Sequence, residues 1–315
     1  MNDAVLVLSA ASAIVAGTPI LLAALGEVIA ERAGVMNLGV EGMMLVGAVA
    51  AFWAGTHTHS LTLALLVGGL AGAALATVHA VLAITLRVNQ TVSGLSLVIV
   101  GSGLSAFLGS TGDRPLVEVG SGVTVERLLP RGLADLPAVG PIVFGHDPVV
   151  YVSWIAVALT GLVLYRTRAG LALRAIGEDP AAADAAGLNV VRVRYAATLV
   201  GGFAAGVGGG YLALAVLGTW QSGMTAGIGW IAVALVILAG WRPGLALIGA
   251  YAFGALRGLG FTLQIAQVSI PSDFLSMLPF VAAYVVVVAV SASPARARRV
   301  AAPAALGEPY SREQR

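Results

Sequence analysis

Long apolar stretches, separated by short segments that carry charged residues, form the dominant pattern along the chain. A helix of about twenty apolar residues crosses the roughly 30 Å hydrocarbon layer of a bilayer. This rule predicts an all-α polytopic transmembrane helical bundle of about 8–10 spans. The predicted spans lie near residues 4–25, 38–55, 62–86, 92–110, 148–165, 195–218, 228–240, 244–260 and 274–291. The span 228–240 is too short to cross as a simple helix, and we expect it to be one half of a helical hairpin.

Residues 166–194 interrupt this pattern with five arginines between two apolar stretches. A short helix is predicted at the centre of the segment. Asp179 is a suitable N-cap, Pro180 suits the first helical position, and Gly187 favours the left-handed conformation that ends a helix. A helix of about seven residues is only about 10 Å long and is not stable alone in water. We therefore expect it to be tethered by the neighbouring spans and held by a partner.

Composition supports the membrane assignment, with 58% hydrophobic and 10% charged residues and a mean hydropathy of +0.94, against about 25% charged residues in soluble domains. The sequence contains neither Cys nor Lys. Thiolate chemistry and a P-loop lysine are therefore excluded. The formal net charge of +2 is too small to indicate a nucleic acid polymer as a partner.

The distribution of arginine predicts the topology, because cytoplasmic loops are enriched in basic residues. If 166–194 is cytoplasmic, thirteen of the seventeen basic residues lie on the inner side: Arg32, Arg87, Arg242, the five of this segment and five after residue 292. The N-terminus is then outside and the C-terminus cytoplasmic. The first span lacks the positive n-region of a signal peptide, and we expect the chain to retain it. We expect a transmembrane domain over 1–293, with an outer loop at 111–147, and a disordered cytoplasmic tail at 294–315.

Several polar residues lie at the starts or ends of predicted spans. Asn37, Glu41 and Gly42 begin the second span, and a carboxylate there should face the bundle or a water-filled cavity rather than lipid. Two interpretations are open: the segment lines a substrate path, or Glu41 is an internal hydrogen-bond anchor. The same choice applies to Asn89, Gln90 and Ser93, which could bind a polar solute or join helices. Trp220 could stack on a passing ring or be an ordinary interfacial tryptophan.

Other side chains carry less specific signals. Glu27, Glu31 and Arg32 look like interfacial charges, and we assign them no chemistry. His57 and His59 lack a third ligand nearby in the sequence, so no metal site is predicted. Small residues recur every four positions in two spans and predict close helix packing. They are Gly68, Gly72, Gly202, Gly206 and Gly210.

Four runs resemble a known family when taken together. They are ERAGVMNLGVEGMMLVGA at 31–48, NQTVSGLSLVIVGSGLSAFLG at 89–109, LRAIGEDPAAADAAGLNVVRVR at 173–194 and MTAGIGWIAVALVILAGWRPGLALIGAYAFG at 224–254. The chain resembles the permease subunits of ABC importers for simple sugars, nucleosides and related solutes. It is most similar to the nucleoside (guanosine-type) permeases.

The resemblance implies a permease subunit that has no enzyme activity and binds no cofactor, since a separate subunit hydrolyses ATP. Its implied partners are a cytoplasmic ABC ATPase, a second permease subunit (a sister chain or a second copy), an extracytoplasmic solute-binding protein and membrane lipid. The location implied is the bacterial plasma (inner) membrane. The residues that would form the coupling helix, which sits in a cleft of the ATPase, are Glu178, Asp179, Pro180, Asp184 and Gly187.

Two alternatives stand beside this hypothesis. One is an ion-coupled secondary transporter that uses Glu41 as its proton or sodium site. The other is an ABC permease for simple sugars rather than nucleosides.

Overall fold

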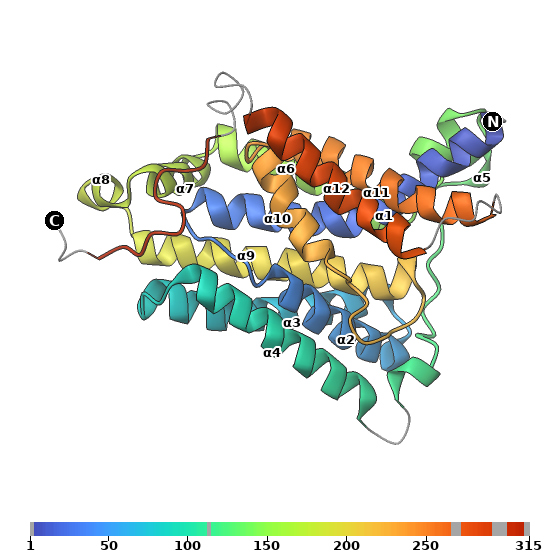
Figure 1. The fold of residues 1–315 in the computed structure, drawn as a ribbon, viewed down its shortest axis with the longest axis horizontal. Helices are drawn as coiled ribbons and strands as arrows, with labels where there is room; N and C mark the ends of the chain where they lie inside the picture. Colours follow the sequence, from blue (N-terminus) through green and yellow to red (C-terminus); the bar gives the residue numbers. More distant parts are fainter. Residues whose placement is uncertain (1–2, 112–114, 266–271, 292–300, 312–315) are drawn as a thin grey trace.

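The computed structural model describes residues 3–111, 115–265, 272–291 and 301–311, and every regular element in these ranges is helical. The long helices run mainly along one axis, with the N-terminus and α8 at opposite ends (Figure 1). Five helices in the described ranges are long and apolar enough to cross a membrane: Leu6–Arg32, Leu61–Thr85, Gln90–Ser110, Pro148–Arg166 and Val190–Val216. The prediction of an all-α transmembrane bundle is confirmed.

The elements follow one another without strands in the described part of the chain. In order they are α1 (Asp3–Arg32), α2 (Val40–Thr58), α3 (Leu61–Ala80), the π-helical turn η1 (Val81–Thr85), α4 (Gln90–Ser110), the 3-10 turn η2 (Leu116–Glu118), α5 (Arg131–Ala134), the π-helical turn η3 (Gly140–Phe144), α6 (Pro148–Arg166), α7 (Arg168–Glu178), α8 (Pro180–Ala185), α9 (Val190–Tyr211), the π-helical turn η4 (Leu212–Val216), α10 (Ile228–Leu238), α11 (Pro243–Ile265) and α12 (Ser272–Ser291).

Many helices begin where the sequence supplies a side-chain cap, because a side-chain oxygen accepts one of the first-turn N–H groups that the helix leaves unpaired. Asn89 caps α4 in this way by accepting from the Val92 N–H at 3.1 Å, and it is exposed. The other capping side chains are Ser60, Asp147, Thr167, Asp179 and Asn189.

The helix α2 lies at the centre of the bundle, packed against α3, α4, α9 and α10. It can approach α3 and α9 closely because glycines meet at the contact. A Cβ on Gly206 would lie 2.3 Å from the Gly68 carbonyl oxygen, and a Cβ on Gly47 would lie 2.4 Å from the Gly206 Cα. A Cβ on Gly72 would lie 2.3 Å from the Gly202 oxygen. Small residues allow such close backbone packing where lipid provides no hydrophobic force between helices.

The fifth glycine of the predicted packing set, Gly210, lies at the same junction. A Cβ placed on it would be 2.7 Å from the Ala51 Cβ of α2. The structure therefore brings all five glycines to the contacts among α2, α3 and α9.

The short predicted span at 228–240 corresponds to α10, which has 11 residues. It is joined to α11 by a turn in which Gly240 and Trp241 have φ of 57° and 55°. Trp241 is buried at 2% exposure. The turn lies close to the C-terminal end of α1, where Arg32 donates to the Gly240 carbonyl at 3.3 Å.

The expectation of a disordered tail at 294–315 does not hold for its described part. Residues 301–311 form a turn that packs on the body of the protein, with Pro303, Ala305 and Ser311 buried. The Ala305 N–H donates to the Gly177 carbonyl at 2.9 Å. Composition suggested disorder, but backbone hydrogen bonds to other segments order these residues, and composition does not report such contacts. Residues 294–300 and 312–315 lie outside the described ranges.

The glycine junction can be tested with Gly206→Ala. The added methyl group would overlap the Gly68 oxygen, and overpacking of this kind costs about 1–3 kcal/mol. The matched control is Gly161→Ala in α6, where no heavy atom lies within 4 Å of the added Cβ. There the helix propensity of alanine should stabilise the protein by up to about 1 kcal/mol. Thermal unfolding in detergent should give a lower midpoint for Gly206→Ala and an unchanged or higher one for the control. Equal midpoints would show that α3 and α9 are not in tight contact.

Candidate functional site

Glu41, in the first turn of α2, is 6% exposed and accepts three hydrogen bonds. Its Oε1 accepts from the Thr225 hydroxyl at 2.6 Å and from the Gly227 N–H at 2.9 Å, and its Oε2 accepts from the Gly229 N–H at 2.7 Å. The carboxylate thus sits at the N-terminus of α10, where N–H groups lack intrahelical partners and the helix dipole favours negative charge.

This geometry bears on the two interpretations of Glu41. Both oxygens are engaged by donors from the α10 end, so the side chain holds α10 against α2 as an internal anchor. A Cβ on Gly229 would lie 2.6 Å from the Glu41 Cα, so only glycine allows this approach. A carboxylate whose oxygens both accept hydrogen bonds is less costly within a membrane bundle.

Two further carboxylates lie inside the bundle, and the sequence interpretation of them was wrong. Glu27 and Glu31 were taken as interfacial charges, yet they are 0% and 2% exposed. The reason is that α1 continues to Arg32, so both side chains belong to a part of α1 that is packed inside the bundle. The Asn37 amide donates to Glu27 Oε1 at 2.7 Å, and the Trp241 indole N–H donates to Glu31 Oε2. The spacing of four residues, which places both on one helix face, was the available signal.

Gln90 and Ser93 hold the connection between α1 and α2. The Gln90 Oε1 accepts from the Met36 N–H at 2.7 Å. His79 Nε2 donates to the Met36 carbonyl at 3.0 Å, and its Nδ1 lies 3.0 Å from the Ser93 hydroxyl oxygen. Gln90, Ser93 and His79 are all buried. These hydrogen bonds therefore join α3 and α4 to each other and to the 33–39 connection.

The remaining residues predicted to line a substrate path lie apart from one another. Gly42 packs against α4, since a Cβ on it would be 2.3 Å from the Leu97 oxygen. Trp220 is 3% exposed, and a Cβ on Gly109 would lie 2.1 Å from its ring. Trp220 thus packs on the far end of α4, while Asn37 and Gln90 lie near its start.

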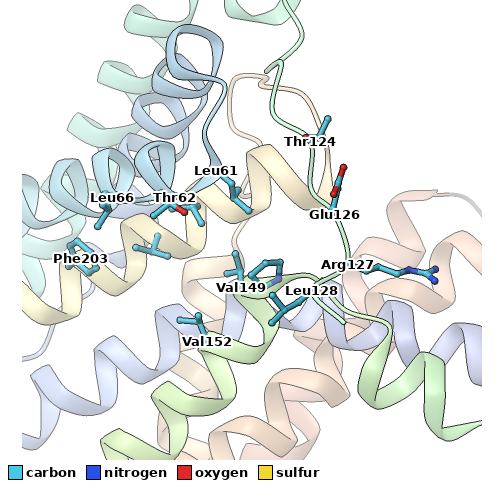
Figure 2. A pocket seen from close by; sticks show the side chains of 13 residues that line it. Leu61, Thr62, Leu66, Thr124, Glu126, Arg127, Leu128, Val149, Val152 and Phe203 are labelled. Carbon is cyan, nitrogen blue, oxygen red and sulfur yellow. The ribbon is translucent and has the colours of Figure 1, made fainter. Parts of the chain in front are cut away.

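Two cavities lie on other parts of the surface. One, of about 670 Å³, lies between α3, α6, α9 and the loop at 124–128. Figure 2 shows Leu61, Leu128 and Val149 close together, whereas the Arg127 side chain points away from them. The second, of about 810 Å³, lies between α2, α3 and α4 and includes Trp53 and Thr56. Their mainly aliphatic walls suit an apolar occupant better than a polar solute, and neither is lined by Glu41, Gln90 or Asn37.

The predicted short helix is present as α8. The Asp179 carboxylate accepts from the Ala182 N–H at 2.9 Å, and Pro180 takes the first helical position. Gly187 has φ of 87°, and the Leu188 N–H donates to the Ala183 carbonyl at 3.1 Å beyond it. Both ends of the helix are therefore closed by the residues that the sequence indicates.

α8 projects from one end of the molecule, beyond α7 (Figure 1). It is tethered to the bundle by a small apolar cluster, in which Ala183 packs with Ile176, Val190 and Tyr310. α7 is in turn fixed at both ends by glycine contacts. A Cβ on Gly170 would lie 2.0 Å from the Val163 oxygen, and one on Gly177 would lie 2.1 Å from the Arg32 oxygen.

A polar cavity of about 500 Å³ opens beside α8. Its lining combines residues of the helix end with two exposed arginines, Arg87 and Arg192. Asp184, Gly187 and Tyr310 also contribute to it. The exposed face of α8 and this cavity form a continuous protein surface at the end of the bundle that holds the 33–39 connection.

Comparison with known proteins identifies the family. A family model described as the permease component of branched-chain amino acid transport systems matches residues 9–290. The chain belongs to this permease family. A nucleoside ABC transporter permease of Lactococcus lactis is 33% identical over 86% of this chain and 88% of its own length. A protein of Haloferax volcanii, provisionally named as a glucose ABC transporter permease, is 40% identical over 78% of this chain and 74% of its own.

A guanosine ABC transporter permease of Bacillus subtilis is 34% identical over 64% of this chain and 66% of its own length. No solved structure matches the chain. Family membership makes the chain a multi-pass membrane permease subunit and not an enzyme. It also implies, in general terms, an ATPase and a solute-binding protein as partners.

The anchoring role of Glu41 in this permease can be tested with Glu41→Gln. The amide retains one acceptor oxygen and presents an NH₂ group to backbone donors, so buried N–H groups lose their partner at a cost of about 1–3 kcal/mol. The matched control is Glu118→Gln in the exposed loop. The unfolding midpoint in detergent should fall for Glu41→Gln and stay unchanged for the control. An unchanged midpoint for both variants would contradict the anchor.

Proposed function

We propose that this chain is the membrane-spanning permease of an ATP-driven importer for nucleosides, and that α8 is the helix through which a separate ATPase drives it. The observation that carries the proposal is α8 itself. It is a six-residue helix, closed at both ends and projecting from the bundle, with Ala183 as its buried contact. Because a helix of this length is not stable alone, its closed ends and tethered base indicate selection for a fixed shape that a partner recognises.

The docking surface for the ATPase would combine the exposed face of α8 with the polar cavity beside it. Arg87 and Arg192 line that cavity and are exposed, so acidic side chains of the ATPase would complement them. Glu178, Asp179, Pro180, Asp184 and Gly187 would act by shaping and positioning the helix. The ATPase would use ATP, and this chain would supply no catalytic group.

Transport would follow alternating access, in which packed helices rock as rigid bodies around a solute site. A solute-binding protein would deliver the solute to the outer face, and a sister permease or a second copy of this chain would complete the membrane part. The ends of the molecule suit this arrangement: α8 lies at one end, and the start of α1 lies at the other with α5 of the 111–147 segment (Figure 1). We infer that the α8 end is cytoplasmic, the N-terminus is outside and the membrane is the bacterial plasma membrane.

Support for nucleosides comes from the Lactococcus relative, named as a nucleoside permease, and the Bacillus relative, named as a guanosine permease. Simple sugars are the second candidate, which the Haloferax relative favours at 40% identity. Ion-coupled transport through Glu41 is not supported, because donors from the α10 end engage both of its oxygens. The choice between the two solute classes depends on a transport measurement.

Radiolabelled guanosine uptake by cells that express the complete importer tests the solute class. We expect saturable uptake that excess unlabelled adenosine or guanosine reduces and excess glucose leaves unchanged. Cells lacking the permease are the control. A different result would replace the nucleoside assignment with the sugar one. In that result the permease supports uptake of labelled glucose, which unlabelled glucose reduces, and does not support uptake of guanosine.

The role of α8 is tested by a pair of substitutions at its N-cap. Asp179→Ala removes the side-chain acceptor and should cost the helix about 1 kcal/mol, whereas Asp179→Ser retains an acceptor. We expect ATP-dependent uptake and co-purification of the ATPase to fall for Asp179→Ala and to stay near wild type for Asp179→Ser. Membrane abundance should be equal for the two variants. Equal uptake by both would contradict a function for the shape of α8.

A further inference from the structure

The segment 303–311, here called the C-terminal strap, lies across the base of α8 at the same end of the molecule (Figure 1). It contacts α7, the 33–39 connection and the first turns of α9. The match to the family model ends at residue 290, before this segment. Its contacts join parts of the chain that the proposed mechanism requires to move together.

The first set of strap contacts is with the end of α7, directly before α8. The Ala305 N–H donates to the Gly177 carbonyl at 2.9 Å, and the Ala304 N–H donates to the Glu178 carboxylate at 3.4 Å. Tyr310 packs on the apolar cluster that contains Ala183 of α8. The strap therefore supports α8 from the side that faces the bundle.

The second set is with the connection between α1 and α2. The Gly307 N–H donates to the Gly34 carbonyl at 3.2 Å. A Cβ on Gly34 would lie 3.1 Å from the Ala305 oxygen, and one on Gly307 would lie 3.4 Å from the Met36 Cε. Leu306 packs against the main hydrophobic core. The strap thus lies in direct contact with the connection on which Asn37 and the first turn of α2 depend.

Arg194 joins both sets. Its side chain is 2% exposed, an unusual position for a guanidinium. Its Nε donates to the Ala33 carbonyl and its Nη1 donates to the Glu308 carbonyl, both at 3.1 Å. One buried cation of α9 therefore fixes the strap and the 33–39 connection to each other.

We propose that the C-terminal strap is a positioning element for transport: it transmits displacement of α8 to the 33–39 connection and from there to α2. The proposal rests on the proposed function of α8. α7 and α8 are separate helices that meet at Asp179, where the backbone is extended with φ of −146°. The strap braces that junction. Displacement then reaches Gly34, α2 and, through Glu41, the start of α10. Packed side chains and hydrogen-bond networks of this kind can carry coupling between two sites.

The experiment compares two truncations in the complete importer, reconstituted in proteoliposomes with its ATPase and binding protein. Ending the chain after Val300 removes the strap, whereas ending it after Ser311 removes only residues 312–315 and is the matched control. Uptake of labelled guanosine, or of labelled glucose if guanosine is not transported, is divided by ATP hydrolysed. The ATPase bound per permease and the unfolding midpoint are measured on the same samples.

Because removal of the strap could impair folding, a point variant accompanies the truncations. Leu306→Ser removes the apolar contact of the strap and keeps the chain length, and Leu306→Met is its volume-conserving control. Both variants leave the exposed face of α8 unchanged. They therefore separate transmission through the strap from docking of the ATPase.

We expect the amount of solute moved per ATP to fall at least about fivefold in the Val300 truncation and in Leu306→Ser. A fivefold change is at the lower end of typical coupling between sites. Bound ATPase should stay near wild type in Leu306→Ser, and both controls should match wild type. An unchanged ratio in the two strap variants would overturn the proposal. So would a parallel loss of uptake and bound ATPase in Leu306→Ser, which would assign the strap to docking. Failure of the proposed function is a different result, in which the wild-type complex itself transports neither probe with ATP.

Discussion

For a six-residue helix in water, the free-energy cost of ordering the backbone exceeds the stabilisation from its few hydrogen bonds. The end of this molecule that carries α8 is organised by that constraint. Asp179 and Gly187 close the helix ends, and Ala183 ties the helix to a small apolar cluster shared with α7, α9 and Tyr310. The tight backbone contact of Gly177 with Arg32 then fixes α7 to α1. A helix that is unstable by itself is thereby held in one shape, which is what a mechanical contact with an ATPase requires.

A second constraint comes from the bilayer, where a buried polar group must find its partner within the protein. Each of the three buried glutamates in the described part of the chain accepts at least one hydrogen bond from a residue outside its own helix. Glu41 accepts from the start of α10, Glu27 accepts from Asn37, and Glu31 accepts from Trp241. Each bond joins α1 or α2 to a segment outside that helix. The hydrogen bonds of these polar groups therefore fix the positions of α10 and the 33–39 connection. The glycine junction of α2, α3 and α9 sets the distance between these three helices.

The features that could be predicted from the sequence are local ones. The ends of α8 follow from Asp179, Pro180 and Gly187, and the glycine spacing of α9 indicates a face for close packing, because each signal lies within a few residues of sequence. The burial of Glu27 and Glu31 has only their four-residue spacing as a local signal, because it depends on α1 continuing to Arg32 and on Trp241, 210 residues beyond Glu31. The order of the 301–311 segment likewise depends on Gly34, Gly177 and Arg194, and its alanine-rich composition carries no sign of them.

The central claim is that α8 is a rigid cytoplasmic element seated on an ATPase. Because the chain has no cysteine, a single Ala185→Cys on the exposed face of α8 gives a unique attachment point for a photo-activated cross-linker. Cross-linking in native membranes, followed by mass spectrometry of the product, tests the claim most directly. The account predicts a covalent product with an ABC ATPase and protection of the cysteine from membrane-impermeant reagents added outside. Labelling from outside, or no product with an ATPase in the intact complex, would contradict it.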